Sequence, residues 1–483
     1  MGAHARGGRR TWRPVMAAAT VIVVFAGYLV ADATDVIPGP LTLAGSAVGT
    51  GPRYRTEALA PAVVGADLES DTPVDASAAQ RVIDGFAASP GVGGDYSVVI
   101  ANRDGSVAAE HAQGTLRQPA STLKTLTAAA AALSLDMGST LTTSTYLDRS
   151  AGPDPRLVLQ GHGDMLLGSG DCDLSHVNGR AGLGTLAKET SQALRAGSIG
   201  KVSLAYDPGF FGPERSPQGI DENNPGGVYF TPTSTLAVDE GRMRSDADRS
   251  ADPDGGGVYL SHDQDPEMRA ADTFAQRLAE EGITVVGDPA VGQLPATSKP
   301  KSLASVESAP LGQLMAYMLR NSDNSLAELF GRLTAVKLGK ENSPRGAVQA
   351  VQEALGREGV NLGDGARMAD CSGLTPGSLV SVATLAAIQR LACDGRHGRL
   401  APLAEGMAVV GLVGTAAGRG KGSDPNGLVR VKTGSLDQVT AMAGNVSRMG
   451  GGLLVFSVIV NNPGDMGGAV QAVNTLMSAL PKL

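Results

Sequence analysis

A serine and a lysine one helical turn apart are the first residues of this chain that could do chemistry. Ser121-Thr-Leu-Lys124 opens the Ala/Leu-rich stretch Ser121–Leu135, which follows Pro119 and is predicted to be a buried helix. A serine becomes a good nucleophile only when a base takes its proton. A lysine can be that base when burial lowers its pKa. The motif alone is weak, because Ser198-Ile-Gly-Lys201 and Ser298-Lys-Pro-Lys301 also match it.

Two further motifs supply polar groups that a cleft would need. Ser322-Asp323-Asn324 is the only Ser-x-Asn in the chain and lies between two segments with helical periodicity. These residue types also favour helix N-caps, and the two interpretations are compatible. Lys432-Thr433-Gly434, the only Lys-Thr-Gly, ends a β-patterned stretch. Its lysine and hydroxyl can hold a carboxylate, and its glycine permits close backbone approach, but an edge-strand lysine before a turn would look the same.

The order Ser-x-x-Lys, Ser-x-Asn, Lys-Thr-Gly on helix, loop and strand resembles the signature of penicillin-recognising enzymes, the penicillin-binding proteins and serine β-lactamases. The 201 residues from Ser121 to Ser322 resemble the spacing in class C low-molecular-mass penicillin-binding proteins, the D-Ala-D-Ala carboxypeptidase/endopeptidases. The resemblance covers about residues 80 to 480. Three more segments are similar to stretches of that family: Leu157–Asp164, with Met165 in place of the usual proline, Asp370–Leu374 and Lys432–Leu436.

The resemblance implies how the peptide bond would be cut. Ser121 would attack the carbonyl of the penultimate D-alanine and form an acyl-enzyme, and Lys124 would accept its proton. Ser322 would relay a proton to the leaving amine, with electrostatic support from Lys432. Water would then free the acyl group.

The resemblance also implies how the substrate would be held. Asn324 would bind the substrate amide, and Thr433 and Ser435 would contact the terminal carboxylate. The backbone N–H groups of Ser121 and Ser435 would form the oxyanion hole. No metal or cofactor is implied, and the expected partners are peptidoglycan stem peptides and β-lactam antibiotics.

Other functions of the same fold remain open on the sequence. A serine β-lactamase would use the same first steps, but the chain has no convincing Glu-x-x-Leu-Asn-type segment to position a deacylating water. An esterase would share the nucleophile chemistry. A catalytically weak peptidoglycan-binding or sensor protein is a third alternative, although a binding module needs no Ser-Lys pair.

The elements that must position these motifs come from both ends of the chain. Tyr96–Ala101 and Ser106–Ala109 flank Asp104-Gly105, which predicts a β-hairpin. The C-terminal part predicts three strands and a closing helix, over Leu428–Lys432, Thr440–Val446, Leu453–Val460 and Gly468–Leu480. We therefore expect a mixed α+β class with one sheet built from both ends. The resemblance implies the penicillin-binding-protein/serine β-lactamase-like transpeptidase fold, an antiparallel sheet with helices on both faces.

The domain organisation follows from these elements. A discontinuous catalytic domain is predicted over residues 79–142 and 302–483. Between its halves, residues 143–301 are predicted to form a mainly β inserted module after the nucleophile helix, with helices over Leu183–Ala196 and Ala270–Glu281. Residues 34–78, rich in Pro, Gly, Ala and Thr, are predicted to be an extracytoplasmic linker.

The N-terminus has the layout of an export signal. Four arginines precede the uncharged apolar run Val15–Ala31. Residues 1–33 are therefore predicted to be a signal or membrane anchor, with the rest of the chain outside. Ala31-Asp32-Ala33 is a possible cleavage site. The protein is thus expected to be extracytoplasmic, anchored to the cell membrane or secreted after cleavage.

Composition narrows the remaining classes. The net charge is −8, and no long Lys/Arg run lies beyond the N-terminus, which argues against nucleic acid as a partner. The six His are scattered, so a metal hydrolase has little support. Cys371 and Cys393 could pair in an exported chain and leave Cys172 unpaired, or all three could be buried thiols.

Overall fold

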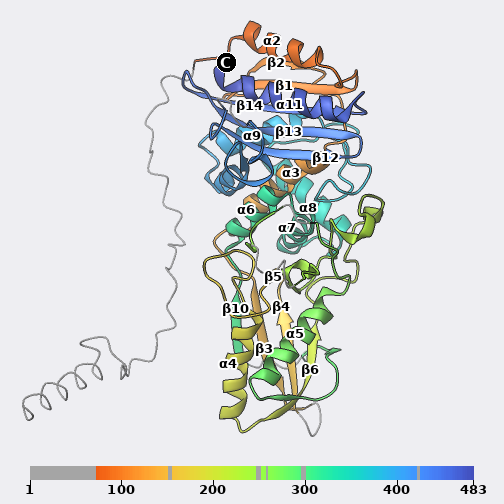
Figure 1. Cartoon of the computed structure of the whole chain (residues 1–483), viewed down its shortest axis with the longest axis vertical. Coiled ribbons are helices and arrows are strands. Elements are labelled where there is room, and N and C mark those ends of the chain that lie inside the picture. Colours follow the sequence, from red (N-terminus) through yellow and green to blue (C-terminus); the bar gives the residue numbers. More distant parts are fainter. Residues whose placement is uncertain (1–71, 151–154, 246–251, 257–258, 295–300, 421–424) are drawn as a thin grey trace, which may run out of the picture. The chain divides into compact units, whose positions relative to one another are not determined.

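The computed structural model describes residues 72–150, 155–245, 252–256, 259–294, 301–420 and 425–483 (Figure 1). The signal or anchor predicted over 1–33 and the linker up to residue 71 lie outside the described residues. Helix α2 (Ala76–Ala87) begins before the predicted linker boundary, because the Asp75 carboxylate accepts the Ala78 N–H and caps it. Within the described ranges, no helix is long and apolar enough to cross a membrane.

A six-stranded antiparallel sheet joins both ends of the chain, as predicted. The hairpin of the N-terminal part pairs with the last strand, so that Tyr96 lies opposite Val460. In spatial order the strands are β11 (Ala408–Val409), β12 (Val429–Leu436), β13 (Val439–Ser447), β14 (Leu453–Asn461), β1 (Tyr96–Asn102) and β2 (Val107–His111).

Helices cover both faces of this sheet (Figure 1). Helices α2 and α11 (Met466–Ala479) pack on one face, and α9 (Val382–Cys393) packs on the other. Because side chains alternate along a strand, neighbouring residues of β14 enter different cores. Phe456 belongs to the core under α11, whereas Val455 belongs to the core that contains α9.

The second core also contains the helices that carry two of the motifs. Helix α3 (Lys124–Ser134) packs against α7 (Asn324–Lys337) and α8 (Pro344–Arg357), and α6 (Leu311–Asn321) precedes α7. The alanines over 128–132 are at most 1% exposed. Their small side chains let α3 lie in the middle of the molecule's helical layer, where a lysine at its start is cut off from water.

The region between the two halves of the catalytic part forms a separate mixed sheet with two helices, α4 (Leu183–Ala196) and α5 (Pro266–Glu280). Strand β3 pairs with β4 in antiparallel fashion, and β4 pairs with β6 in parallel fashion. The strands are β3 (Thr142–Asp148), β4 (Arg156–Gly161), β6 (Lys201–Asp207), β8 (Thr284–Val285), β9 (Ala290–Val291) and β10 (Ala304–Glu307), and β5 (Asp164–Leu167) and β7 (Leu236–Val238) form a parallel pair. Strand β10 therefore extends this sheet beyond residue 301.

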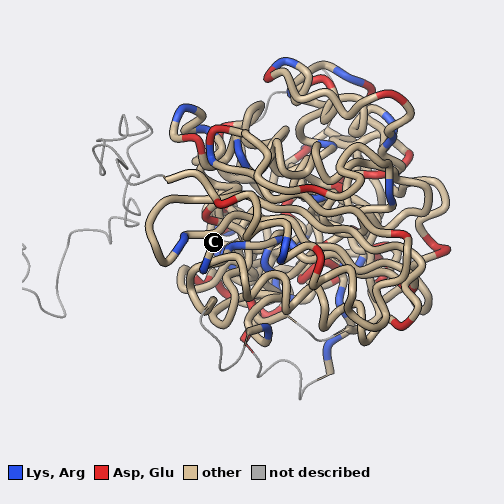
Figure 2. The backbone as a smooth tube through the Cα atoms, turned by 90° about the horizontal axis from the view of Figure 1, so that it is seen from above, with Lys and Arg blue, Asp and Glu red and all other residues tan. Residues whose placement is uncertain are grey.

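All three cysteines are free thiols, so Cys371 and Cys393 do not form a disulfide in this structure. Cys371 is fully buried against α7, where a Cβ added to Gly331 would overlap its sulfur. Cys172 and Cys393 are half-buried. Acidic and basic residues are interspersed along the described backbone in the view of Figure 2.

Candidate active site

Ser121 and Lys124 are brought together by a tight first turn. Residues Ala120–Leu123 form one turn of 3₁₀ helix, and α3 begins only at Lys124, so the α-helix predicted from Ser121 begins later than expected. In a 3₁₀ turn the side chains at i and i+3 eclipse each other. The Lys124 Nζ accordingly lies 2.9 Å from the Ser121 Oγ.

The Lys124 amine has no contact with solvent. It donates to the Asn324 Oδ1 at 2.6 Å and to the Ser372 carbonyl oxygen at 2.7 Å. Burial lowers the pKa of Lys124 to about 8, against the opposing effect of the carboxylates of Asp370 and Asp323. A lysine with this pKa is neutral in an appreciable fraction of molecules near neutral pH, which is what a general base requires.

Ser322 stands between helices α6 and α7 in the left-handed conformation, with φ 59° and ψ 37°. Asp323 caps α7 by accepting the Leu326 N–H at 3.0 Å, so the motif is both a helix cap and part of the site, as the sequence allowed. The Ser322 Oγ lies 2.9 Å from the Lys432 Nζ. Non-glycine residues in this conformation are strained and cluster at functional sites.

Asn324 links the two sides of the site. Its Oδ1 accepts from Lys124, and its Nδ2 donates to the Tyr229 carbonyl oxygen at 2.8 Å. An amide nitrogen carries two hydrogens. The predicted contact between Asn324 and a substrate amide would therefore be made with the second one, beside an amide group that is already fixed.

Strand β12 brings Lys432, Thr433 and Ser435 to the same place. Lys432 is fully buried, and burial, followed by the nearby Lys124, lowers its pKa well below the usual value. The Thr433 Oγ1 lies 2.9 Å from the Thr415 Oγ1, and Ser435 is exposed. A Cβ on Gly434 would lie 2.8 Å from the Pro119 carbonyl oxygen, so only glycine lets the strand pass this close to the turn that carries Ser121.

The loop Asp370–Leu374 contacts Lys124 through the Ser372 carbonyl oxygen, a backbone group that the sequence did not reveal. The Asp370 carboxylate accepts the N–H groups of Gly373 and Thr375 at 2.7 and 2.8 Å, which fixes the turn at Ser372-Gly373. That turn directs the Ser372 carbonyl toward Lys124. The Ser372 hydroxyl itself donates to Asp370 at 2.6 Å.

Glu328 is a second residue that sequence reasoning missed. It is 1% exposed, and its Oε1 accepts the Cys371 N–H at 2.9 Å. Burial and the nearby Asp370 raise the pKa of Glu328 to about 8. Its position four residues after Asn324, on the same face of α7, was the available signal.

Six of the seven predicted site residues lie together in the structure, joined by direct hydrogen bonds or as neighbours on a strand: Ser121, Lys124, Ser322, Asn324, Lys432 and Thr433. The seventh, Ser435, lies two residues after Thr433 on β12. A base beside a hydroxyl, with a second lysine–serine pair nearby, is suited to acyl transfer. Among the described residues, no group of three His, Cys, Asp or Glu side chains could hold a metal ion.

Comparison with known proteins places this geometry in a family. The chain matches the D-Ala-D-Ala carboxypeptidase 3 (S13) family over residues 79–262 and 254–478. It is 30% identical to the carboxypeptidase DacB of Mycolicibacterium smegmatis, over 84% of this chain and 85% of the relative. It is 31% identical to a D-alanyl-D-alanine carboxypeptidase of Actinomadura sp. over 43% of this chain and 39% of the relative.

The fold has a counterpart among solved structures. Penicillin binding protein 4 (dacB) of Haemophilus influenzae superposes with a TM-score of 0.64 at 22% identity, over 83% of this chain and 99% of that one. The predicted mixed α+β transpeptidase fold is therefore confirmed. With the family matched over most of its length, the chain belongs to the D-Ala-D-Ala carboxypeptidase 3 (S13) family and is a serine D-alanyl-D-alanine carboxypeptidase that acts on peptidoglycan.

Proposed function

We propose that Ser121 is the nucleophile of this carboxypeptidase and that Lys124 is its general base. The proposal rests on one observation, the buried Lys124 amine 2.9 Å from the Ser121 hydroxyl with its pKa lowered to about 8. Lys124 takes the proton of Ser121 while the oxygen bonds to the carbonyl carbon of the penultimate D-alanine. The backbone N–H groups of Ser121 and Ser435 stabilise the resulting oxyanion, each contributing about 3 kcal/mol.

Ser322 and Lys432 serve the departure of the terminal D-alanine. When the C–N bond breaks, the leaving nitrogen takes the proton of the Ser322 hydroxyl, and the proton first received by Lys124 restores that hydroxyl. Lys432, 2.9 Å from the Ser322 Oγ, favours this transfer electrostatically. A water molecule then attacks the acyl-enzyme and releases the shortened peptide, and Ser121 regains its proton.

Thr433 and Ser435 hold the terminal carboxylate, and Asn324 holds the substrate amide. Both hydroxyl residues lie on β12, one of them buried beside Thr415 and the other exposed, so the strand offers two donors along one edge. The substrate chain would run alongside this strand.

β-Lactams would acylate the same serine. Penicillin binding protein 4 of H. influenzae, which shares the fold, has been solved in complex with a β-lactam. The reaction takes place outside the cytoplasmic membrane, where peptidoglycan lies, after export directed by residues 1–33. Those residues either remain as an anchor in the membrane or are removed.

The test is intact-mass analysis of the protein with and without benzylpenicillin, together with an assay of D-alanine release from a stem pentapeptide. Ser121→Ala should form no covalent adduct and should release no D-alanine, because among the described residues Ser121 has the only hydroxyl paired with Lys124. Ser198→Ala, in the second Ser-x-x-Lys match, is the control and should behave like the wild type. An adduct that persists in Ser121→Ala would disprove the assignment of the nucleophile.

A further inference from the structure

The inserted region forms hydrogen bonds with the segment Ser322–Ser325, the catalytic loop. Three consecutive residues, Asp323, Asn324 and Ser325, each form a hydrogen bond with a residue of the predicted inserted module. Asp323 accepts from the guanidinium of Arg242 at 2.9 Å, Asn324 donates to the Tyr229 carbonyl oxygen at 2.8 Å, and the Ser325 Oγ accepts the Thr231 N–H at 2.9 Å. Two of these bonds use the backbone of the inserted region, so the only side chain it contributes to this set is that of Arg242.

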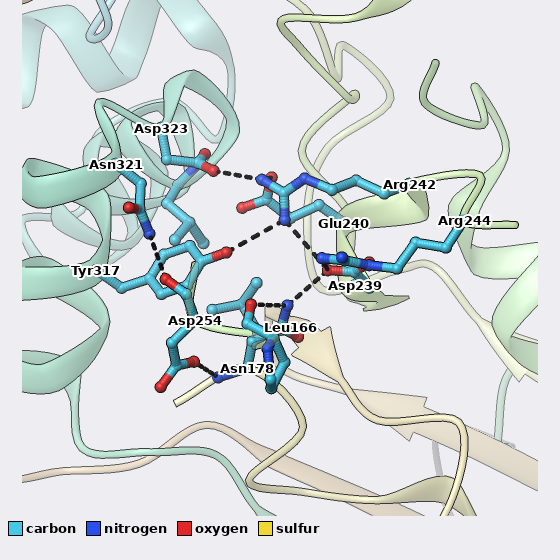
Figure 3. A network of polar contacts seen from close by, with 12 residues as sticks. Leu166, Asn178, Asp239, Glu240, Arg242, Arg244, Asp254, Tyr317, Asn321 and Asp323 are labelled. Atoms are coloured by element: carbon cyan, nitrogen blue, oxygen red, sulfur yellow. Dashed lines mark hydrogen bonds and ion pairs between the residues drawn. The ribbon is translucent and has the colours of Figure 1, made fainter. Parts of the chain in front are cut away.

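Arg242 is held rigidly at its own position. Its Nη2 donates to the Glu240 Oε2 at 2.9 Å, and its Nη1 donates to the Asp239 Oδ1 at 3.2 Å and to the Tyr317 hydroxyl at 3.3 Å (Figure 3). The side chain is only 14% exposed. A guanidinium fixed on several sides can in turn fix the carboxylate of Asp323, which has little freedom of its own at 5% exposure.

Charge is arranged so that the Arg242–Asp323 contact persists. Three carboxyl groups face the guanidinium, those of Asp239, Glu240 and Asp323. Burial raises the pKa of Glu240 well above its usual value, against the opposing effect of Arg242. Arg244 supplies a second cation, which pairs with Asp239. Two cations, Arg242 and Arg244, thus face these three carboxyl groups.

The two carboxylate oxygens of Asp323 accept hydrogen bonds from different groups. The Oδ1 caps α7 through the Leu326 N–H, and the Oδ2 binds Arg242. On either side of Asp323 stand Ser322, in a strained left-handed conformation, and Asn324, whose amide contacts Lys124. A shift of about 1 Å in such a loop is enough to lower a reaction rate by about 100-fold.

We propose that Arg242 is a positioning residue for the reaction, which acts through Asp323 to hold Ser322 and Asn324 in register with Ser121, Lys124 and Lys432. The inserted region then helps to set the geometry of the active site, through the contact of Arg242 with Asp323. This inference rests on the proposed roles of Ser322 and Asn324.

The experiment compares the second-order rate constant of acylation by a fluorescent penicillin, and kcat and KM for D-alanine release, in the full-length wild type and in variants. Arg242→Gln should lower both the acylation rate constant and kcat by about 100-fold and change KM much less, because substrate contacts are kept. Arg242→Lys, which keeps the charge but loses the fork geometry, should recover part of the rate. Added guanidinium ion should also restore part of the rate to an Arg242→Ala variant.

Two further variants separate positioning from a general loss of stability. Asp323→Asn keeps an oxygen that can cap α7 but loses the ion pair, and it should reproduce the defect of Arg242→Gln, with the double variant no worse than either single one. Arg244→Gln, which disturbs the same cluster without touching Asp323, should react within about twofold of the wild type.

Wild-type rates in folded Arg242→Gln or in Asp323→Asn would overturn the inference, as would additive effects in the double variant. If Arg242→Gln fails to fold, the comparison of Asp323→Asn with Arg244→Gln still decides. Failure of the proposed function looks different, because the wild type itself would then show no adduct on Ser121.

Discussion

Lys124 and Lys432 are two fully buried lysines whose electrostatic surroundings are opposite. Burial lowers the pKa of both, but the carboxylates of Asp370, Asp323 and Glu328 raise that of Lys124 again, whereas Lys124 itself and Arg419 lower that of Lys432 further. The pKa of Lys124, at about 8, is therefore close to neutral pH. An anion beside Lys432, such as the terminal carboxylate of a substrate, would raise its pKa again.

The tuning of Lys124 predicts the pH dependence of acylation. A base must be unprotonated to take the serine proton, and the neutral fraction of Lys124 grows as pH rises toward its pKa of about 8. The acylation rate constant should thus rise about tenfold per pH unit below about pH 7 and level off above about pH 8.5. Stopped-flow measurements with a fluorescent penicillin, checked by circular dichroism at each pH, would show this. A rate that is flat or falls across this range would contradict the role of Lys124.

At the residue scale, the sequence pointed to residues that lie close together in the structure where partners are local or carry a motif. Ser121 and Lys124 are neighbours on one turn, and Ser322, Asn324 and Lys432 stand in the only copies of their motifs. Arg242 could not be found in this way. Its partner Asp323 is 81 residues away, and nothing in an arginine between acidic residues says which distant carboxylate it will meet.

Among the elements, the loop that carries Ser372 has a strict backbone requirement. Gly373 has φ +81°, and a Cβ there would overlap the Ala120 carbonyl oxygen next to the nucleophile. Gly373→Ala should therefore lower the free energy of unfolding by about 3 kcal/mol and slow acylation, because strain and overlap add. Chemical denaturation and the penicillin assay would measure both effects.

Gly359→Ala is the matched control for this substitution. Gly359 has a similar φ of +75°, but nothing lies within 4 Å of the added Cβ. It should cost about 1 kcal/mol and leave acylation unchanged. Equal losses of activity in the two variants would show that the contact between Gly373 and the nucleophile turn is unimportant.

Periodicity located the elements well and their local geometry less well. The predicted helix over Leu183–Ala196 has the bounds of α4, and the C-terminal strands were found within a few residues. The 3₁₀ turn at Ser121 was missed, because 3₁₀ and α turns share the same residue preferences and differ only in which carbonyl accepts each N–H. The inserted sheet was expected to end before residue 302, but β10 belongs to it, since Ala304 pairs with Thr145.

For the whole molecule, the cores show how the inserted region is attached. Most of its apolar side chains form a core of their own, which includes Phe274, but Phe211 is buried with the residues of α3 and α7. Phe211 also packs edge-on against Phe210, with 4.9 Å between the ring centroids. The guanidinium carbon of Arg332 lies over the Phe211 ring, 5.5 Å from its centroid. The attachment is therefore apolar as well as polar.

Replacing Phe211 or Phe274 by alanine should destabilise different parts of the molecule. Phe211→Ala and Phe274→Ala should each lower the free energy of unfolding by about 3–5 kcal/mol, since both side chains are at most 3% exposed. Hydrogen–deuterium exchange should increase in α7 as well as in the inserted region for Phe211→Ala. It should increase only around α4 and α5 for Phe274→Ala. The same exchange pattern in both variants would contradict separate cores.

The pairing of β1 with β14 also determines how late in synthesis the sheet can be completed. Tyr96 finds Val460 only after nearly the whole protein has been made, and the nucleophile turn meets Gly434 just as late. Ser121 is synthesised well before Gly434, so a partly synthesised chain holds the proposed nucleophile without the strand that lies beside it. A chain that is cut short before Leu453 lacks β14, the strand that joins β1 to β13, and we expect it to be inactive.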